Sequence, residues 1–438
     1  MLDKRSSAIL HRLVNWVDQF KICFGRRAQQ VSLDQYVEGL LNDSRRKSMQ
    51  AMLERVREPV SYQAFQHFIT HAPWDAAAVW KRLLAVLPQR NGVLILDDTG
   101  FPKQGRKSVG VARQYSGTLG KVGNCQVAVT AALWGKQRAW LVGAELYLAE
   151  SWLTPERRTE ARIPARVQFV EKWRSALRLV RRVRTAGLQV EAVVADSGYG
   201  DVTAFRTALD KQGLPYGLGI SSTLTFFRGR PRLHRARRPP GGRPPTRLVL
   251  DGRVRSASAA ALAKELPTEA WKAVSWRNGN NRPWEAEFAA LRVTPAHDWR
   301  QRRLAKEVWL LCQRPIGETT PSKYYLSNLP PDASLSDLVR LTHHRWAIEQ
   351  QYQELKDELG LDHFEGRTFP GWHHHVVLCA IAYAFLQKER MRSRTKPPIT
   401  FPAIRAVLQE IFTGLLFITK PRYMEWLLEL QRNRPLRN

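Results

Sequence analysis

The sequence lacks several features that would mark a membrane protein or a disulfide-rich one. It has no run of 18 or more apolar residues, and the longest such region, Val376 to Leu386, is too short to span a bilayer. The N-terminal segment MLDKRSSAILHRLVNW has neither the apolar stretch nor the cleavage site of a signal peptide. The four cysteines lie far apart without a C-x-x-C pair, which argues against a disulfide framework or a zinc ribbon. The sequence therefore predicts no membrane association and a reducing, cytoplasmic location.

Acidic residues are also scarce. The chain of 438 residues has 39 Asp and Glu against 69 Lys and Arg, a formal net charge of +30. Such an excess indicates a polyanionic partner, and nucleic acid is the usual one. Apolar residues at 44% and charged residues at 25% are ordinary for a chain that buries a core, and the length predicts two or three domains. Composition alone does not separate a passive binder from an enzyme.

Residues 1–88 are predicted to form a helical domain that either binds DNA or supports the rest of the chain. Apolar residues recur there at intervals of three and four. Ser32 followed by Gln35 resembles a capping box at a helix start, and a second helix start is expected near Ser61. Small helical modules are common readers of DNA sequence, so DNA contact is one function open to this region.

The sequence pattern changes at residue 89, and residues 89–220 are predicted to form the first part of an α/β core. Strands are expected at the GVLILDDTG run after residue 91, at Cys125–Leu133, Ala139–Leu148, Val190–Ala195 and Tyr216–Ile220. Helices are expected at Ala165–Thr185, with Gly187 as a C-cap, and at Val202–Gln212. Three antiparallel strands followed by helix, strand, helix and strand predict a mixed sheet flanked by helices.

Residues 221–332 are predicted to be a β-rich insertion that begins with an arginine-rich loop. Residues 228–247 hold eight arginines, five prolines and three glycines without an acid, so they are either a solvated linker or a flexible contact to a phosphate backbone. Strands are expected at Trp271–Trp276, Phe288–Val293, Val308–Cys312 and Tyr324–Leu326. Residues 333–395 return to helices as the second part of the core, and residues 396–438 form a C-terminal helical tail.

Two carboxylates are expected where predicted strands end. Asp98 follows the first strand and Asp196 the fourth, and strand ends are where α/β folds expose side chains to a ligand. Paired carboxylates in so basic a chain indicate a site for a hard divalent cation such as Mg²⁺. Asp97 is a rival for Asp98, because adjacent residues of a strand point to opposite faces and the register is not fixed by the sequence.

The third acid is expected on a helix, and Glu349 in RWAIEQQYQELKDELGLDHF is the best candidate. On a regular helix Arg345, Glu349 and Lys356 fall on one face, beside a stripe of apolar residues expected to pack. That stripe comprises Leu341, Ile348, Tyr352, Leu355 and Leu359. An ordinary surface helix with an Arg–Glu pair explains the same spacing.

The stretch DDTGFPKQGRKSVGVARQYSGTLGKVGNCQVAV, the ADSGYG stretch and the R-x₃-E-x₆-K spacing resemble bacterial insertion-sequence transposases of the DDE type. The nearest likeness is to the family named for insertion sequence 701, over residues 30 to 390. The resemblance implies a ribonuclease-H-like catalytic core, with the first Asp on its first strand, the second near its fourth strand and the Glu on a late helix. It also implies a strand-rich insertion between the second Asp and the Glu.

The resemblance assigns roles residue by residue. Asp98, Asp196 and Glu349 match the three metal-binding catalytic acids, and Arg345 and Lys356 match residues that hold phosphate near the cleavage site. Related families carry a Tyr three residues before the Arg, where this sequence has Thr342, so hairpin formation on the flanking DNA is left open. In some relatives a tryptophan of the insertion stacks on a flipped base. The candidates here are Trp271, Trp276 and Trp284, although core packing is the ordinary fate of any one of them.

The sequence therefore predicts a DDE transposase that cuts the ends of its insertion sequence and transfers the 3′-OH to target DNA. Two Mg²⁺ ions, replaceable by Mn²⁺, are the expected cofactors, and DNA and a second copy of the chain are the expected partners, in a bacterial cytoplasm at the nucleoid. The alternatives are a non-catalytic DNA-binding protein derived from a transposase and a stand-alone metal-dependent nuclease. Further DNA contacts are expected from Lys103, Lys107, Arg113, Lys121, Arg235, Arg237 and Arg238.

Overall fold

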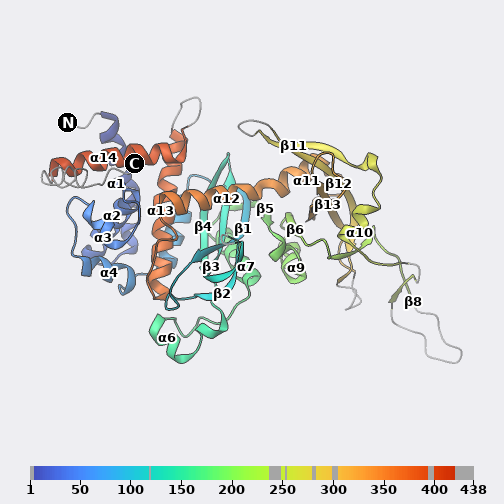
Figure 1. Ribbon diagram of the computed structural model, residues 1–438, viewed down its shortest axis with the longest axis horizontal. Coiled ribbons are helices and arrows are strands. Elements are labelled where there is room, and N and C mark those ends of the chain that lie inside the picture. Colours follow the sequence, from blue (N-terminus) through green and yellow to red (C-terminus); the bar gives the residue numbers. More distant parts are fainter. Residues whose placement is uncertain are drawn as a thin grey trace, which may run out of the picture.

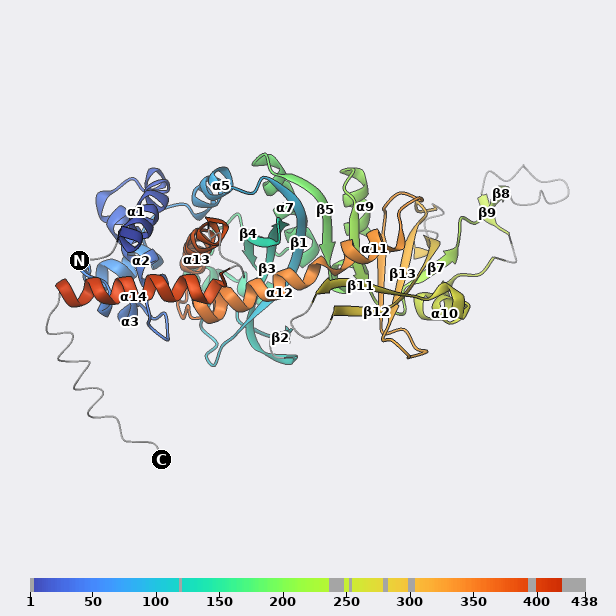
Figure 2. The same ribbon diagram turned by 90° about the horizontal axis from the view of Figure 1, so that it is seen from above.

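The computed structural model describes residues 4–117, 120–235, 248–251, 254–278, 283–297, 304–392 and 399–419. The molecule is elongated, with N-terminal helices at one end, a strand-rich insertion at the other and a mixed α/β core between them (Figures 1 and 2). Arg237 and Arg238 of the arginine-rich loop lie outside the described residues. None of the helices in the described part of the chain combines the length and apolar character needed to cross a bilayer.

Five strands form the centre of the core sheet in the order β4-β3-β1-β5-β6, and a sixth, β2, pairs with the first residues of β3. β3 is antiparallel to β1 and to β4, whereas β5 is parallel to β1 and β6 is parallel to β5. Three antiparallel strands followed by two parallel ones are the arrangement expected of the ribonuclease-H-like core, and the predicted fold class is confirmed. The strands are β1 (Asn91–Pro102), β2 (Ala112–Ser116), β3 (Lys121–Gly135), β4 (Arg138–Leu146), β5 (Gln189–Ala195) and β6 (Tyr216–Ile220).

Helices cover both faces of the core sheet. Residues of β1 alternate between the two: Val93 and Ile95 pack with Ile348 of α12, whereas Leu94 and Leu96 belong to the larger apolar core that holds α7. The helices around the core are η2 (Glu150–Trp152), α6 (Pro155–Ala161), α7 (Lys172–Thr185), α8 (Ser197–Gly200), α9 (Thr203–Lys211), α11 (Leu335–Thr342), η5 (His343–Arg345), α12 (Trp346–Gln353) and η6 (Glu354–Glu358).

The predicted insertion continues the core sheet. β14 pairs antiparallel with β6, and the order then runs β13, β12, β7 and β10, with β11 paired to β12. The strands of this part of the sheet are β7 (Thr225–Arg228), β10 (Ala257–Ser258), β11 (Lys272–Asn278), β12 (Pro283–Pro295), β13 (Val308–Arg314) and β14 (Lys323–Ser327), with helices α10 (Ala259–Lys264) and η3 (Thr268–Ala270). β8 (Leu233–Arg235) and β9 (Leu248–Leu250) pair with each other in a separate two-stranded sheet. This edge therefore carries the insertion directly beside the strands that hold the acids.

The N-terminal helices pack on a helix from the far end of the chain. α13 (Phe369–Arg392) contacts β4 of the core sheet and also α2, α4 and α5, and in Figure 2 it lies between α2 and β4. The helices of this end are α1 (Lys4–Asp18), η1 (Lys21–Cys23), α2 (Arg27–Leu41), α3 (Met49–Glu54), α4 (Tyr62–Thr70), α5 (Ala76–Val86) and α14 (Phe401–Thr419). Residues from α1 to α14 share one apolar cluster, so α1 and α14 are joined to the α/β core by packing.

Three local expectations are corrected. The helix expected from Ala165 begins at Lys172, because Val167 N–H bonds Pro164 and the Arg158 guanidinium bonds the carbonyls of Pro164 and Val167. Ser32 is not a helix start: α2 begins five residues earlier, and the Ser32 hydroxyl donates to the Ala28 carbonyl.

The third correction concerns the first strand. β1 runs on to Pro102, so Asp98 lies inside the strand and not at its end. Its neighbours Thr99 to Pro102 all pair with β3, which keeps this part of β1 rigid beside the acids.

Candidate active site

β1 presents adjacent carboxylates on its two faces. Asp97 Oδ2 accepts a hydrogen bond from Arg345 Nη1 at 3.0 Å, on the face of the sheet covered by α12. Asp98 Oδ2 accepts one from Lys172 Nζ at 2.6 Å, at the start of α7 on the opposite face. Both faces of the strand before them are apolar and buried, from Val93 to Leu96, which is why the sequence left the choice between the two open.

Asp97 is the more deeply buried of the two, at 7% exposure. Burial raises the pKa of its carboxyl to about 7, and repulsion from Asp196 and Asp98 adds to the rise, whereas Arg345 opposes it. A buried carboxylate whose charge is destabilised in this way needs a cation beside it.

Asp98 has two partners that the sequence does not reveal. Besides Lys172, the Tyr199 hydroxyl donates to Asp98 Oδ1. Tyr199 is the tyrosine of ADSGYG and is buried, and burial raises its pKa well above the usual value. Its position three residues after Asp196 was the available signal, but only the parallel pairing of β1 with β5 brings it to Asp98.

Asp196 lies beside this pair because β1 and β5 are parallel neighbours. Leu96 is in register with Ala195, and Asp196 follows at the strand end as the N-cap of α8, where its Oδ1 accepts from Gly198 N at 3.0 Å. Burial and the Asp98 carboxylate raise the pKa of Asp196. The turn requires Gly200, because a Cβ there would lie 1.8 Å from the Gly219 carbonyl oxygen of β6.

Glu349 reaches the acids through Arg345. The Arg345 guanidinium donates to Glu349 Oε1 at 2.5 Å and, with its other nitrogen, to Asp97, so one cation bridges two carboxylates. The Glu349 side chain is half exposed, at 56%, whereas that of Asp97 is largely covered. The predicted contact between Arg345 and Glu349 is therefore present, although Arg345 lies in the turn just before the helix of Glu349.

The expectation of one regular helical face is corrected beyond Glu349. Arg345 belongs to the 3₁₀ turn η5, and Lys356 lies in η6, a turn of π-helix, so the three residues do not follow the 100° spacing. Lys356 Nζ donates to the Gly100 carbonyl oxygen at 3.0 Å, two residues after Asp98 on β1. The apolar stripe predicted on this helix is buried as expected, at Leu341, Ile348, Tyr352, Leu355 and Leu359.

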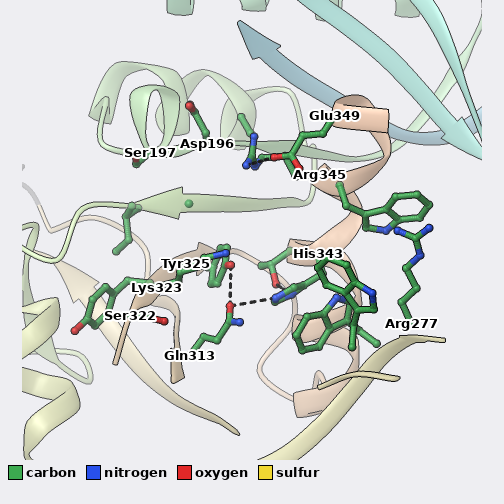
Figure 3. Close-up of a pocket in the computed structure, with 18 of the residues that line it drawn as sticks. Asp196, Ser197, Arg277, Gln313, Ser322, Lys323, Tyr325, His343, Arg345 and Glu349 are labelled. Atoms are coloured by element: carbon green, nitrogen blue, oxygen red, sulfur yellow. Dashed lines mark hydrogen bonds and ion pairs between the residues drawn. The ribbon is translucent and has the colours of Figure 1, made fainter. Parts of the chain in front are cut away.

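A cavity of about 430 Å³ opens between these acids and the insertion (Figure 3). Asp196, Arg345 and Glu349 line one side of it. Trp276 of β11 and Trp284 of β12 line the side formed by the insertion. Trp284 is 54% exposed, whereas Trp271 is buried, so core packing accounts for Trp271 but not for Trp284.

The wall of the cavity below Arg345 is a polar network. Thr342 lines it, and its hydroxyl donates to the Leu338 and Val339 carbonyls of α11. A tyrosine does reach the cavity, but from β14: the Tyr325 hydroxyl donates to Gln313 Oε1 at 3.0 Å, and His343 Nε2 lies 3.2 Å from the same oxygen (Figure 3). Burial raises the pKa of Tyr325 to about 12.

The further DNA contacts predicted from the sequence differ in their surroundings. Lys107, Arg113, Lys121 and Arg235 are exposed. Lys103 is half-buried, and its ammonium donates to the carbonyls of Asp362 and Phe364, so it holds the chain after η6 in place. Arg237 and Arg238 are among the residues that the structure does not describe.

The donor set suits a divalent cation by its chemistry. Among the described residues no three His, Cys, Asp or Glu side chains already converge as metal ligands. Carboxylate oxygens are nevertheless what hard cations prefer, burial raises the pKa of Asp97 and Asp196, and cationic Arg345 already bridges Asp97 to Glu349.

Comparison with known proteins places the chain in a family. A family model described as DDE superfamily endonuclease matches residues 19–283, more than half of the chain. The chain is 31% identical, over 189 residues, to the probable transposase for insertion sequence element IS701 of Microchaete diplosiphon; the match covers 42% of this chain and 47% of that protein, so it spans about half of the relative's length. A solved structure of the piggyBac transposase synaptic complex with hairpin DNA aligns over 95% of this chain and 79% of that chain, with a TM-score of 0.43 and 10% identity. The family match and the IS701 relative confirm the resemblance found in the sequence.

Proposed function

Because the chain belongs to the DDE superfamily endonucleases, we propose that it is a transposase that cuts DNA at the ends of an insertion sequence and joins the freed 3′ ends to target DNA. The observation that carries this proposal is the grouping of Asp97, Asp196 and Glu349 around Arg345, beside a cavity walled by tryptophans of the insertion. The net charge of +30 supplies the attraction to DNA on which such a site depends.

Endonucleases of this superfamily generally use divalent metal ions. We propose Mg²⁺ for this chain, as two ions that Mn²⁺ can replace, held by an aspartate of β1 together with Asp196 and Glu349. When bound, such ions would activate the attacking oxygen and stabilise the leaving oxygen of a phosphodiester. The resemblance favours Asp98 as the first ligand, but the geometry supports Asp97, because Asp97 shares the face of α12 with Arg345 and Glu349.

The protein's own residues would then hold the DNA. When a metal neutralises Asp97 and Glu349, Arg345 would be released from them. Its two terminal nitrogens, Nη1 and Nη2, could then donate hydrogen bonds to a phosphate. Lys356, beside β1 at Gly100, is placed to bind a second phosphate. Exposed Trp284 offers a flat apolar surface for an unstacked base at the rim of the cavity.

The partners proposed are the terminal repeats, target DNA and a second copy of the chain, because two ends must be held together before strand transfer. We propose that residues 1–88 and the arginine-rich loop of the 221–332 insertion bind the repeats and their flanks. The core is then made of residues 89–220 and 333–395, with 396–438 as a tail. A bacterial cytoplasm, at the nucleoid, is the proposed location.

The test is incubation of the wild-type protein with end-repeat DNA, a target plasmid and Mg²⁺. The proposal predicts nicked ends, free 3′-OH groups and joined products, all absent in EDTA and with Glu349→Gln. Binding without cutting would favour the non-catalytic DNA-binding protein, and cutting without joining would favour a stand-alone nuclease. Unchanged nicking by Glu349→Gln would show that the acids are placed wrongly.

A further inference from the structure

A two-stranded ribbon extends from the core sheet next to the acids. β1 pairs with β3 only from Cys125 onward, whereas β2 pairs with β3 from Lys121 to Cys125. Residues 121–124 of β3 are therefore paired to β2 but not to β1, and the hairpin continues past the end of β1 (Figure 2). Residues 99–144 contain seven Lys and Arg and no Asp or Glu, so nothing acidic within this stretch opposes a polyanion.

One face of the ribbon exposes an apolar pair beside a cation. Tyr115 lies directly opposite Val122, and the two are 63% and 53% exposed. Because side chains alternate along a strand, exposed Arg113 lies on the same face as Tyr115. Tyr115 and Val122 thus form an exposed apolar pair at the end of a strand, where polar residues are more usual.

That face is continuous with the active-site face of the sheet. Thr130, eight residues after Val122 on β3, hydrogen-bonds Tyr352 of α12 and pairs with Asp97 on β1. The register between Val122 and Thr130 runs without a shift. Val122, Tyr115 and Arg113 are thus on the side of the sheet that carries Asp97 and the Glu349 helix.

We propose that the Arg113, Tyr115 and Val122 face of this ribbon binds the same DNA duplex that enters the active site, with Tyr115 packing against a base or sugar in a groove and Arg113 contacting phosphate. The inference rests on the proposed function. A two-stranded ribbon has the width that a major groove admits. Eight residues of strand span about 26 Å, so the contact falls roughly eight base pairs from the scissile phosphate.

DNA is the occupant that the charges favour. Lys121 is exposed next to Val122 on β3, and Arg106 and Lys107 are exposed in the segment between β1 and β2; no Asp or Glu occurs in the sequence between Asp98 and Glu145. Aromatic contact with DNA is a non-ionic term, whereas contacts from Arg113 release counterions. The two kinds of contact on one face can therefore be told apart by their dependence on salt.

The experiment measures the affinity of the full chain for an end-repeat duplex over a range of salt concentrations. Tyr115→Ala should weaken binding roughly 5- to 100-fold without changing the slope of log K against log salt. Arg113→Gln should lower that slope by about one. Tyr115→Phe should bind as wild type, and so should Ile316→Ala, a matched control at an exposed apolar residue of the insertion (52% exposed). A duplex cut back to about five base pairs from the scissile phosphate should abolish the difference between wild type and Tyr115→Ala, because it no longer reaches the ribbon.

Two results would overturn the inference alone: wild type binds and cuts, but Tyr115→Ala has the same affinity; or Tyr115→Ala changes the molar mass of the protein while its affinity for DNA is unchanged, which would assign the face to a second copy. Wild type that neither binds nor cuts end-repeat DNA would overturn the proposed function and the inference with it. Because Tyr115 is exposed, its variants are expected to fold, and matching melting temperatures confirm this.

Discussion

Asp97 and Asp98 are neighbours in sequence, yet each is bonded to a cation on the opposite side of β1: Asp97 to Arg345 beside Glu349, and Asp98 to Lys172 of α7. Asp196 lies close to both. The two carboxylates of β1 therefore have different partners on opposite faces of the sheet. Asp97 lies on the face that carries Arg345 and Glu349, and Asp98 joins β1 to α7 on the opposite face.

Metal-free protein should lose stability as pH rises through the range in which Asp97 ionises. Burial raises the pKa of Asp97 to about 7, whereas an unfolded aspartate titrates near about 3.9, so between these values the unfolded state binds fewer protons. Stability due to this group is present below about pH 4 and lost by about pH 7. Asp97→Asn should abolish this pH dependence. At about pH 8 in EDTA its free energy of unfolding should exceed that of wild type by as much as about 4 kcal/mol. Thermal unfolding of both proteins across this pH range measures it; parallel curves would contradict the burial of a charged Asp97.

Replacing Arg345 by lysine should keep the positive charge but lose the paired hydrogen bonds that join Asp97 to Glu349. A lysine ammonium cannot present the planar fork with which Arg345 bonds Asp97 and Glu349 together. We expect Arg345→Lys to bind end-repeat DNA within a few-fold of wild type and to cut it at least about tenfold more slowly. Single-turnover cleavage and filter binding give the two numbers. Arg340→Lys, on the exposed side of α11, is the control that should change neither.

Gly200 should not tolerate a side chain. A Cβ at this position would meet the Gly219 carbonyl oxygen at 1.8 Å, and a backbone atom cannot move aside cheaply. Gly200→Ala should therefore lower the free energy of unfolding by at least about 2 kcal/mol and displace Asp196, with loss of cleavage. Denaturant unfolding and a cleavage assay test both effects. Gly25→Ala, where a Cβ meets nothing within 4 Å, should be neutral.

Lys172 and Asp98 should be coupled only weakly, because both side chains are partly exposed, at 35% and 27%. A double-mutant cycle with Lys172→Met and Asp98→Asn should give about 0.5–1 kcal/mol of interaction in stability. Urea unfolding of the four proteins measures it. A coupling near zero would mean that the ion pair does not hold α7 to β1 in solution.

Much of the core could be predicted from the sequence, because its strands are short aliphatic runs with clear ends. The strand at Tyr216–Ile220 lies as expected, and β5 starts one residue before its predicted start. Gly187, with a φ of +77°, ends α7 as expected. The start of α7 was predicted wrongly because the Arg158 side chain holds the preceding loop by hydrogen bonds. No local sequence pattern indicates such a contact.

The candidate site was predictable in its residue types but not in its register. β1 is buried on both faces, so no alternation of polar and apolar residues told Asp97 from Asp98. Lys172 carries no signal in the sequence and Tyr199 only its position three residues after Asp196, because both approach Asp98 only after the sheet has formed. His374 likewise shows its environment only in the folded chain, where it is buried in α13 and stacks on Trp74.

We propose that Asp97, with Asp196 and Glu349, forms the metal-dependent cutting site. The most direct test is the single-turnover rate at which wild type, Asp97→Asn and Asp98→Asn cut an end-repeat duplex in saturating Mg²⁺. We predict that Asp97→Asn is slower by at least about 100-fold, whereas Asp98→Asn, which loses only its bonds to Lys172 and Tyr199, stays within about tenfold of wild type. The reverse order of rates, or two variants as fast as wild type, would contradict the assignment of Asp97.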